Sequence, residues 1–142
     1  ILAEITGFAD IGFDPARMGL APVGAIAQVL SNTKTHLDDY SVVELNAAFA
    51  AQVLACKATL SSDVLMKKWF SEYGFNKAIG NLHESQLNPN GDAIALGHPI
   101  GVTGVRISLT SILETIRRQD KHAMATACIG GGQAVAMTFK VR

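Results

Sequence analysis

Three residues of types that support nucleophilic or acid–base chemistry lie beside turns of the chain. Cys128 ends an apolar run and precedes three glycines, Asn46 ends a short β-branched run, and His98 lies in a Gly-His-Pro sequence. An imidazole can act as a base towards a thiol or donate to an oxyanion. A thiol beside backbone N–H groups can be a nucleophile or a proton carrier, and an amide can hold a water or a substrate oxygen.

Each of these residues also has a purely structural interpretation. His98 could shape a tight turn, because Pro99 restricts its backbone. Cys128 could be a small buried hydrophobe at a strand end, the usual environment of free cysteine. Asn46 could be a helix N-cap, a position that Asn favours. Cys56 lies within an Ala-rich stretch and is interpreted as core.

The elements that must position these residues form three units of extended run, turn and helix, followed by two strands. The pattern predicts strands at 1–8, 41–45, 85–88, 123–129 and 134–141, and helices at 22–32, 47–60 and 103–118. We therefore expect an α/β fold of order βαβαβαββ, with a five-stranded mixed sheet and helices packed on both faces. Ligands of such sheets bind outside the carboxyl ends of the strands.

Two helices carry distinctive apolar patterns. The helix at 47–60 is apolar nearly all round, which predicts burial on most sides and a further layer to cover it. The helix at 103–118 has one apolar stripe, formed by Val105, Leu109, Ile112, Leu113 and Ile116. Between these helices, 61–85 is the least regular part of the chain. We expect it to be a surface insertion with a short helix near 64–73 and a small satellite core.

Composition excludes several classes of protein. The 142 residues include 12 basic and 12 acidic side chains, so a broad basic face for nucleic acid or a polybasic membrane anchor is not expected. Two cysteines without a Cys-x-x-Cys predict neither a zinc site nor a disulfide framework, and favour a reducing intracellular setting. The chain opens inside an apolar stretch without Met, and we expect it to be part of a longer protein.

The glycines between 97 and 104 invite a comparison with phosphate-binding loops. No Gly-x-Gly-x-x-Gly occurs there, and no Lys-Ser or Lys-Thr follows Gly104. A nucleotide-binding α/β domain, which would have to bind ATP or NAD, is therefore a poorly supported alternative.

Taken together, four segments resemble the C-terminal half of a thiolase, the acyl-CoA C-acyltransferase family. They occur in the family's order and span nearly the whole chain. They are Asp14-Pro15-x-x-Met18-Gly19-x-x-Pro22, Glu44-Leu45-Asn46-Ala47-Ala48-Phe49-Ala50, Asn90-Gly91-x-Ala93-Ile94-Ala95-Leu96-Gly97-His98-Pro99-Ile100-Gly101 and Cys128-Ile129-Gly130-Gly131-Gly132.

The resemblance implies a role for five residues. His98 matches the residue that activates the acylated cysteine and helps to bind a thioester oxygen. Cys128 matches the second cysteine, which moves a proton at the α-carbon or the thiol. Asn46 matches the residue that positions an oxyanion-hole water, and Gly130 matches a backbone N–H donor of the other oxyanion hole. Phe49 matches a residue near the pantetheine arm.

The same resemblance implies reversible Claisen condensation of acyl-CoA or thiolysis of 3-oxoacyl-CoA, with coenzyme A as substrate or product and no metal or redox cofactor. Residues 1–142 would be the C-terminal domain, and the nucleophile-bearing N-terminal half would be its partner. No Cys-x-Ser motif of that half occurs here, so we expect the isolated chain to be inactive. A homodimer or homotetramer of the full-length protein in the cytoplasm is the expected assembly.

Three features depart from the family pattern. Ala47 stands where the Asn-Glu-Ala-Phe motif has Glu, Asp92 stands where Gly is usual, and 61–85 is longer than the usual connection. The loss of a carboxylate at 47 motivates an alternative: a degenerate, non-catalytic domain that binds acyl-CoA or supports assembly.

Overall fold

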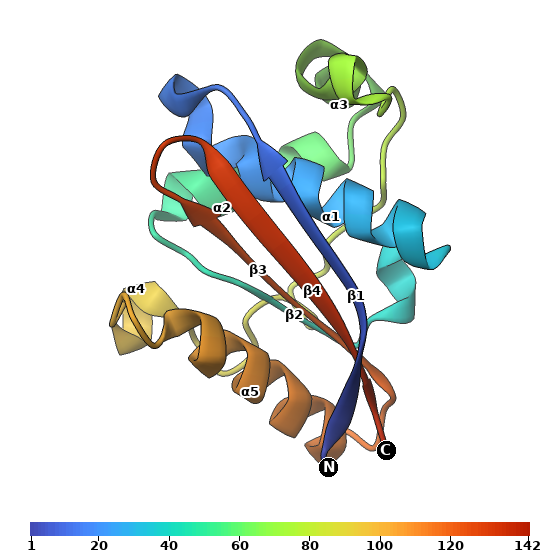
Figure 1. The fold of residues 1–142 in the computed structure, drawn as a ribbon, viewed down its shortest axis with the longest axis vertical. Helices are drawn as coiled ribbons and strands as arrows, with labels where there is room; N and C mark the ends of the chain where they lie inside the picture. Colours follow the sequence, from blue (N-terminus) through green and yellow to red (C-terminus); the bar gives the residue numbers. More distant parts are fainter.

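The computed structural model describes residues 1–142 as a four-stranded sheet with helices on both faces (Figure 1). No helix has the length and hydrophobicity needed to cross a membrane. The strands are β1 (Ala3–Gly12), β2 (Val42–Leu45), β3 (His122–Ile129) and β4 (Gln133–Val141). The helices are α1 (Ala21–Thr33), α2 (Ala50–Leu60), α3 (Asp63–Phe70), α4 (Ala93–Leu96) and α5 (Thr103–Arg117), with short 3-10 helices at Pro15–Leu20, Leu37–Asp39 and Ser71–Tyr73.

The sheet has the strand order β1-β4-β3-β2, and it is mixed as predicted. The β2 and β3 strands are parallel, whereas β4 is antiparallel to both of its neighbours. Helix α1 packs on β1, β4 and β3, and α5 packs on β3 and β2 from the opposite face (Figure 1). The parallel pair matters for function, because it brings the carboxyl ends of β2 and β3 to the same edge.

Alternation along β3 divides its side chains between two cores of unequal size. Met124 belongs to the large core beneath α1, whereas Ala123 and Ala125 belong to a small core beneath α5.

The expected fifth strand at 85–88 is not formed, and this prediction was wrong. Its only ladder contact is a parallel bridge between Leu87 and Val43. Asn88 then adopts a positive φ of 46°, which ends the extended run. Its side-chain amide accepts from the Leu45 N–H at 2.8 Å and donates to the Leu45 carbonyl at 2.9 Å. The edge of β2 is therefore satisfied by the backbone of Gln86 and Asn88 at Val43, and by the Asn88 side chain at Leu45, where a longer fifth strand would have paired.

Helix α2 begins three residues later than expected, at Ala50 rather than at 47. Phe49 is its N-cap, so the residues between Asn46 and Phe49 are a separate connection. The helix is not buried on most sides in this chain. Cys56 is buried, whereas Leu54 on the opposite side is 65% exposed.

The apolar stripe predicted on α5 exists, but much of it is exposed, along a groove between the helix and the sheet. Val105 is 69% exposed and Leu109 is 44% exposed. The buried residues of α5 are instead Thr103, Ile107, Ser111, Glu114 and Thr115. The helix thus packs on the sheet through Ile107 and otherwise through small and polar side chains, and leaves an apolar face uncovered.

The segment at 61–85 contributes to the main core, so the expectation of a satellite core was wrong. Met66 and Phe70 of α3 are fully buried and belong to the same core as α1. The Phe70 ring stacks on Phe13 with a centroid distance of 4.9 Å, and the Tyr73 hydroxyl donates to the Gly12 carbonyl at 2.8 Å. These contacts attach the segment to the chain that follows β1.

Candidate active site

The carboxyl ends of β2 and β3 place Asn46 and Cys128 at one edge of the sheet. Leu45 of β2 is in register with Thr126 of β3. The Asn46 N–H donates to the Thr126 carbonyl at 2.9 Å, and Cys128 follows two residues further along β3. The fold therefore brings together two residues that are 82 positions apart in the sequence.

Asn46 is not a helix N-cap, because α2 begins four residues later. Its side chain is buried, and its Oδ1 atom has no hydrogen-bond partner. Its backbone, by contrast, is held on both sides, since its carbonyl accepts from the Ala48 N–H at 3.1 Å. A buried, unpartnered amide oxygen on a fixed backbone is suited to accept from a water molecule or a ligand.

Gln52 connects the two sequence-predicted residues, although sequence reasoning did not single it out. Its Oε1 accepts from the Ala48 and Phe49 N–H groups, so its Nε2 must face the other way. Nε2 lies 3.3 Å from the Asn46 carbonyl oxygen and 3.6 Å from the Cys128 Sγ. Gln is typical of the third helical position in a capping box, but this signal depends on knowing that the helix begins at Ala50.

The Cys128 thiol is half-buried, and burial raises its pKa above the ordinary value. The raised pKa keeps the side chain protonated at neutral pH. The Gln52 N–H lies where it can stabilise a thiolate once the proton has left. The environment thus suits a group that first donates a proton and then takes one back.

His98 is exposed and lies in the turn between α4 and α5. Its Nδ1 is 2.7 Å from the Thr103 hydroxyl, and that hydroxyl lies 3.1 Å from the Pro99 carbonyl oxygen, to which it can donate. A Thr103 proton directed at the Pro99 carbonyl leaves the hydroxyl oxygen free to accept from an Nδ1–H. The Nε2 atom then carries the free lone pair, so the ring is set up as a base at Nε2. Thr103 is a second positioning residue that sequence reasoning missed.

The three glycines after Cys128 form the turn between β3 and β4. A Cβ at Gly132 would clash with the Phe13 carbonyl oxygen, and its φ is +85°. Gly130 and Gly131 have open space where a Cβ would lie. The turn thus leaves backbone at Gly130 accessible to a ligand, two residues beyond Cys128.

Phe49 lies at the outer end of the connection that begins with Asn46. Its side chain is 66% exposed, although it is a large aromatic residue. An exposed ring at the N-cap of α2 offers an apolar surface next to the Asn46 backbone. No contact in the structure assigns that surface to a ligand.

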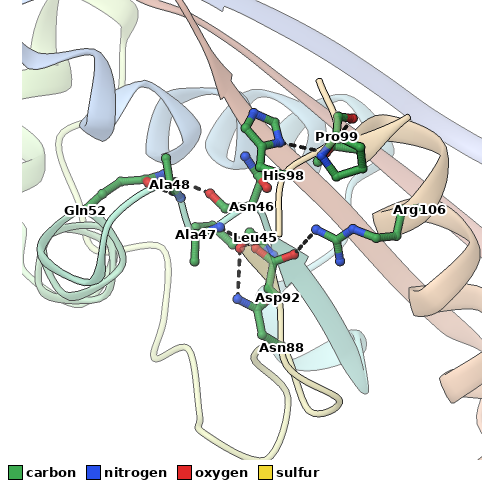
Figure 2. A network of polar contacts seen from close by, with 11 residues as sticks. Leu45, Asn46, Ala47, Ala48, Gln52, Asn88, Asp92, His98, Pro99 and Arg106 are labelled. Carbon is green, nitrogen blue, oxygen red and sulfur yellow. Dashed lines mark hydrogen bonds and ion pairs between the residues drawn. The ribbon is translucent and has the colours of Figure 1, made fainter. Parts of the chain in front are cut away.

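A buried polar cluster lies on the inner side of the same connection. The Asp92 carboxylate accepts from the Ala47 N–H and from Arg106 Nη2, the latter at 2.5 Å (Figure 2). Glu44 is fully buried, and neither of its carboxylate oxygens has a hydrogen-bond partner. Burial and then the Asp92 charge raise the Glu44 pKa to about 7. No group of three or more His, Cys, Asp or Glu side chains is arranged to hold a metal ion.

These groups could perform proton transfer next to a carbonyl or thiol. The set comprises an imidazole with a free Nε2, a protonated thiol, an unpartnered amide oxygen and exposed glycine backbone. The structure joins Asn46 and Cys128 through Gln52, whereas no hydrogen bond joins His98 to either of them.

The chain was compared with known proteins. The sequence model of the thiolase C-terminal domain matches residues 1–141. A probable acetyl-CoA acetyltransferase of Escherichia coli is 40% identical over 99% of this chain. The human mitochondrial 3-ketoacyl-CoA thiolase is 40% identical over 98% of it. The chain spans 30% of the length of each of these relatives.

Solved structures agree with the sequence comparison. The Bacillus anthracis acetyl-CoA acetyltransferase superimposes with a TM-score of 0.82 at 35% identity, over 99% of this chain and 31% of that one. The human mitochondrial 3-ketoacyl-CoA thiolase in complex with CoA gives a TM-score of 0.79 at 38% identity, over 99% of this chain and 30% of that one. By sequence and by fold, the chain belongs to the thiolase family, as a thiolase C-terminal domain.

Proposed function

We propose that the chain is the C-terminal part of an enzyme that interconverts acyl-CoA and 3-oxoacyl-CoA by Claisen condensation and thiolysis. One observation carries the proposal. The buried Asn46 oxygen without a partner lies at the sheet edge that also holds the half-buried Cys128 thiol. An amide that binds a water or an oxygen atom, next to a proton-carrying thiol, fits an enolate-forming reaction.

In thiolysis, a cysteine thiolate from the remainder of the protein attacks the keto carbon of the substrate. The bond between that carbon and the α-carbon breaks, and its electron pair stays on the α-carbon of departing acetyl-CoA. The Cys128 thiol gives a proton to that carbon. The Cys128 thiolate then takes the proton of the incoming CoA thiol, whose sulfur accepts the acyl group and releases the first cysteine. Coenzyme A is substrate and product, and no further cofactor takes part.

His98 and Asn46 serve the thioester in this scheme. The Nε2 lone pair of His98 takes the proton of the nucleophilic cysteine, because Thr103 occupies Nδ1. The protonated ring and a water held by the Asn46 amide then stabilise one oxyanion, and the Gly130 N–H stabilises the other. Phe49 provides the apolar contact for the pantetheine arm.

The uncovered apolar surface gives the missing part of the protein a place to pack. A groove lies between α5 and the sheet, and its exposed lining includes Ile5, Phe8, Val105 and Leu109. Because the chain is 30% of the length of its relatives, we propose that the nucleophile-bearing N-terminal half covers this groove. The complete protein would then assemble as a homodimer or homotetramer.

Thiolysis of acetoacetyl-CoA by the full-length protein tests the proposal. Wild-type activity that His98→Ala abolishes supports it, and His83→Ala provides the control of an exposed histidine outside the site. A folded wild-type protein that cleaves neither acetoacetyl-CoA nor longer 3-oxoacyl-CoA substrates would contradict it.

Ala47 favours a second candidate function, a non-catalytic protein that binds acyl-CoA. The motif that contains Asn46 lacks its carboxylate at this position. Calorimetric binding of acetyl-CoA by the full-length protein without turnover would establish that function. The residue at the nucleophile position of the complete protein gives an independent answer, because a cysteine there favours the enzyme.

A further inference from the structure

The two motif positions at which this chain departs from its family are in direct contact. Ala47 has no carboxylate where the Asn-Glu-Ala-Phe motif has one, and Asp92 has a carboxylate where the Gly-His-Pro segment has Gly. In the structure the Asp92 Oδ2 accepts from the backbone N–H of Ala47 itself (Figure 2). The carboxylate lost from one motif thus has a counterpart in the other motif, hydrogen-bonded to the residue that lacks it.

Asp92 is held firmly enough to act as an anchor. Its side chain is 2% exposed, and its Oδ1 is paired with Arg106 Nη2 at 2.5 Å. Arg106 belongs to α5, and Asp92 immediately precedes α4. One carboxylate therefore ties the end of β2 to the segment that leads to His98 and to the helix that follows it.

The contact bears directly on Asn46. The Ala47 N–H belongs to the peptide group that follows Asn46, and Asp92 fixes that group. The Thr126 carbonyl fixes the peptide group that precedes Asn46. With both flanking peptide groups held, the Asn46 side chain projects from a backbone of defined orientation, which an oxyanion site requires.

The pairing of the neighbouring charged side chains leaves Arg106 available to Asp92. Glu114 is engaged by Arg117 and Arg118, so it does not compete for Arg106. Glu44 is the remaining carboxylate of the cluster, and it makes no hydrogen bond. Arg106 is the cation that faces both Glu44 and Asp92, and its hydrogen bond goes to Asp92. Arg106 Nε and Nη1 have no hydrogen-bond partner, so a third carboxylate, introduced at 47, would compete with Asp92 and Glu44 for this one guanidinium.

We infer that Asp92, paired with Arg106, is a positioning residue for Asn46, and that it supplies from the Gly-His-Pro segment the carboxylate that position 47 lacks. This inference rests on the proposed function for its catalytic meaning. The contact itself is independent of that function and can be tested separately.

The catalytic test compares four full-length proteins: wild type, Asp92→Gly, Ala47→Glu and the double variant. Each single substitution should lower kcat for acetoacetyl-CoA thiolysis by about 100-fold and leave KM nearly unchanged, because Asn46 is misplaced while the substrate still binds. The double variant has the residues of the family motifs at both positions and should recover most of kcat. Losses that simply multiply in the double variant would overturn the inference.

A second measurement does not depend on activity. Hydrogen–deuterium exchange of the peptide that contains Ala47, followed by mass spectrometry in the full-length protein, should be faster in Asp92→Gly. Asp92→Asn retains a hydrogen-bond acceptor without the charge, so it should protect Ala47 better than Asp92→Gly does. Unchanged exchange in both variants would overturn the inference. An inactive wild type with faster exchange in Asp92→Gly would refute the proposed function but support the anchor.

Discussion

Replacing Gln52 by Glu should raise the pKa of the Cys128 thiol, with little effect on helix α2. One carboxylate oxygen can still accept from the Ala48 and Phe49 N–H groups, as the Gln52 Oε1 does. A negative charge at a helix N-terminus is also favourable. The other oxygen takes the place of Nε2, 3.6 Å from the Cys128 Sγ, where a donor becomes a charged acceptor.

The size of this effect follows from the distance. Two unit charges 3.6 Å apart interact by about 4–5 kcal/mol at an effective dielectric constant of about 20, which corresponds to about three pKa units. Water reaches the half-buried thiol and screens the charge, so we expect an upward shift of about one to two units. Gln52→Met removes the amide without adding charge, and its shift should be smaller, because only a donor to the thiolate is lost.

The assay is the pH dependence of Cys128 alkylation by iodoacetamide in the full-length protein, measured by mass spectrometry of the Cys128 peptide. Cys56 serves as an internal reference, because burial raises its pKa to about 12 and it should react slowly at every pH. The pKa of Cys128 should be lowest in wild type, higher in Gln52→Met and highest in Gln52→Glu. The same pKa in wild type and Gln52→Glu would refute the role assigned to Gln52.

Three further outcomes follow from the structure. The folded-state pKa of Glu44 is raised from 4.5 to about 7, so its contribution to stability falls as pH rises through that interval. In thermal denaturation, the melting temperature of Glu44→Gln should therefore equal that of wild type near pH 4.5 and exceed it above pH 7. Gly132→Ala should lower the unfolding free energy by about 2 kcal/mol or more, measured by urea denaturation, because its Cβ would clash with the Phe13 carbonyl. The isolated chain should self-associate in sedimentation experiments, and replacing the exposed Val105 and Leu109 by Ser should reduce this. A monodisperse wild-type chain would contradict the last expectation.

Local patterns in the sequence were enough to predict much of the architecture. The alternation from Val135 to Val141 predicted β4, and the apolar spacing from Val105 to Ile116 predicted α5. The order of four motifs predicted the family, which the match over residues 1–141 confirmed. The two elements and each single motif could be read directly because each depends on neighbours within a few positions of the chain.

Contacts between distant residues decided what local patterns left open. Whether 85–88 formed a strand depended on its bonds to β2: its backbone bonds reach Val43, whereas at Leu45 the Asn88 side chain binds both backbone groups. Whether Asn46 capped a helix depended on Gln52, which binds the N–H groups that Asn46 might have bound. The spacing of apolar residues contains no information about side chains from other segments that bind the same backbone groups.

The sequence by itself therefore determined the family, the mixed sheet with helices on both faces, and the residue types available for chemistry. Only the tertiary structure decided which of these residues meet, that Thr103 holds the His98 Nδ1, and that the substitutions at Ala47 and Asp92 contact each other. It also decided that much of the apolar stripe of α5 stays exposed. The physical reason is that a local pattern shows that a face or a polar atom needs a partner, whereas the identity of that partner depends on how the whole chain packs.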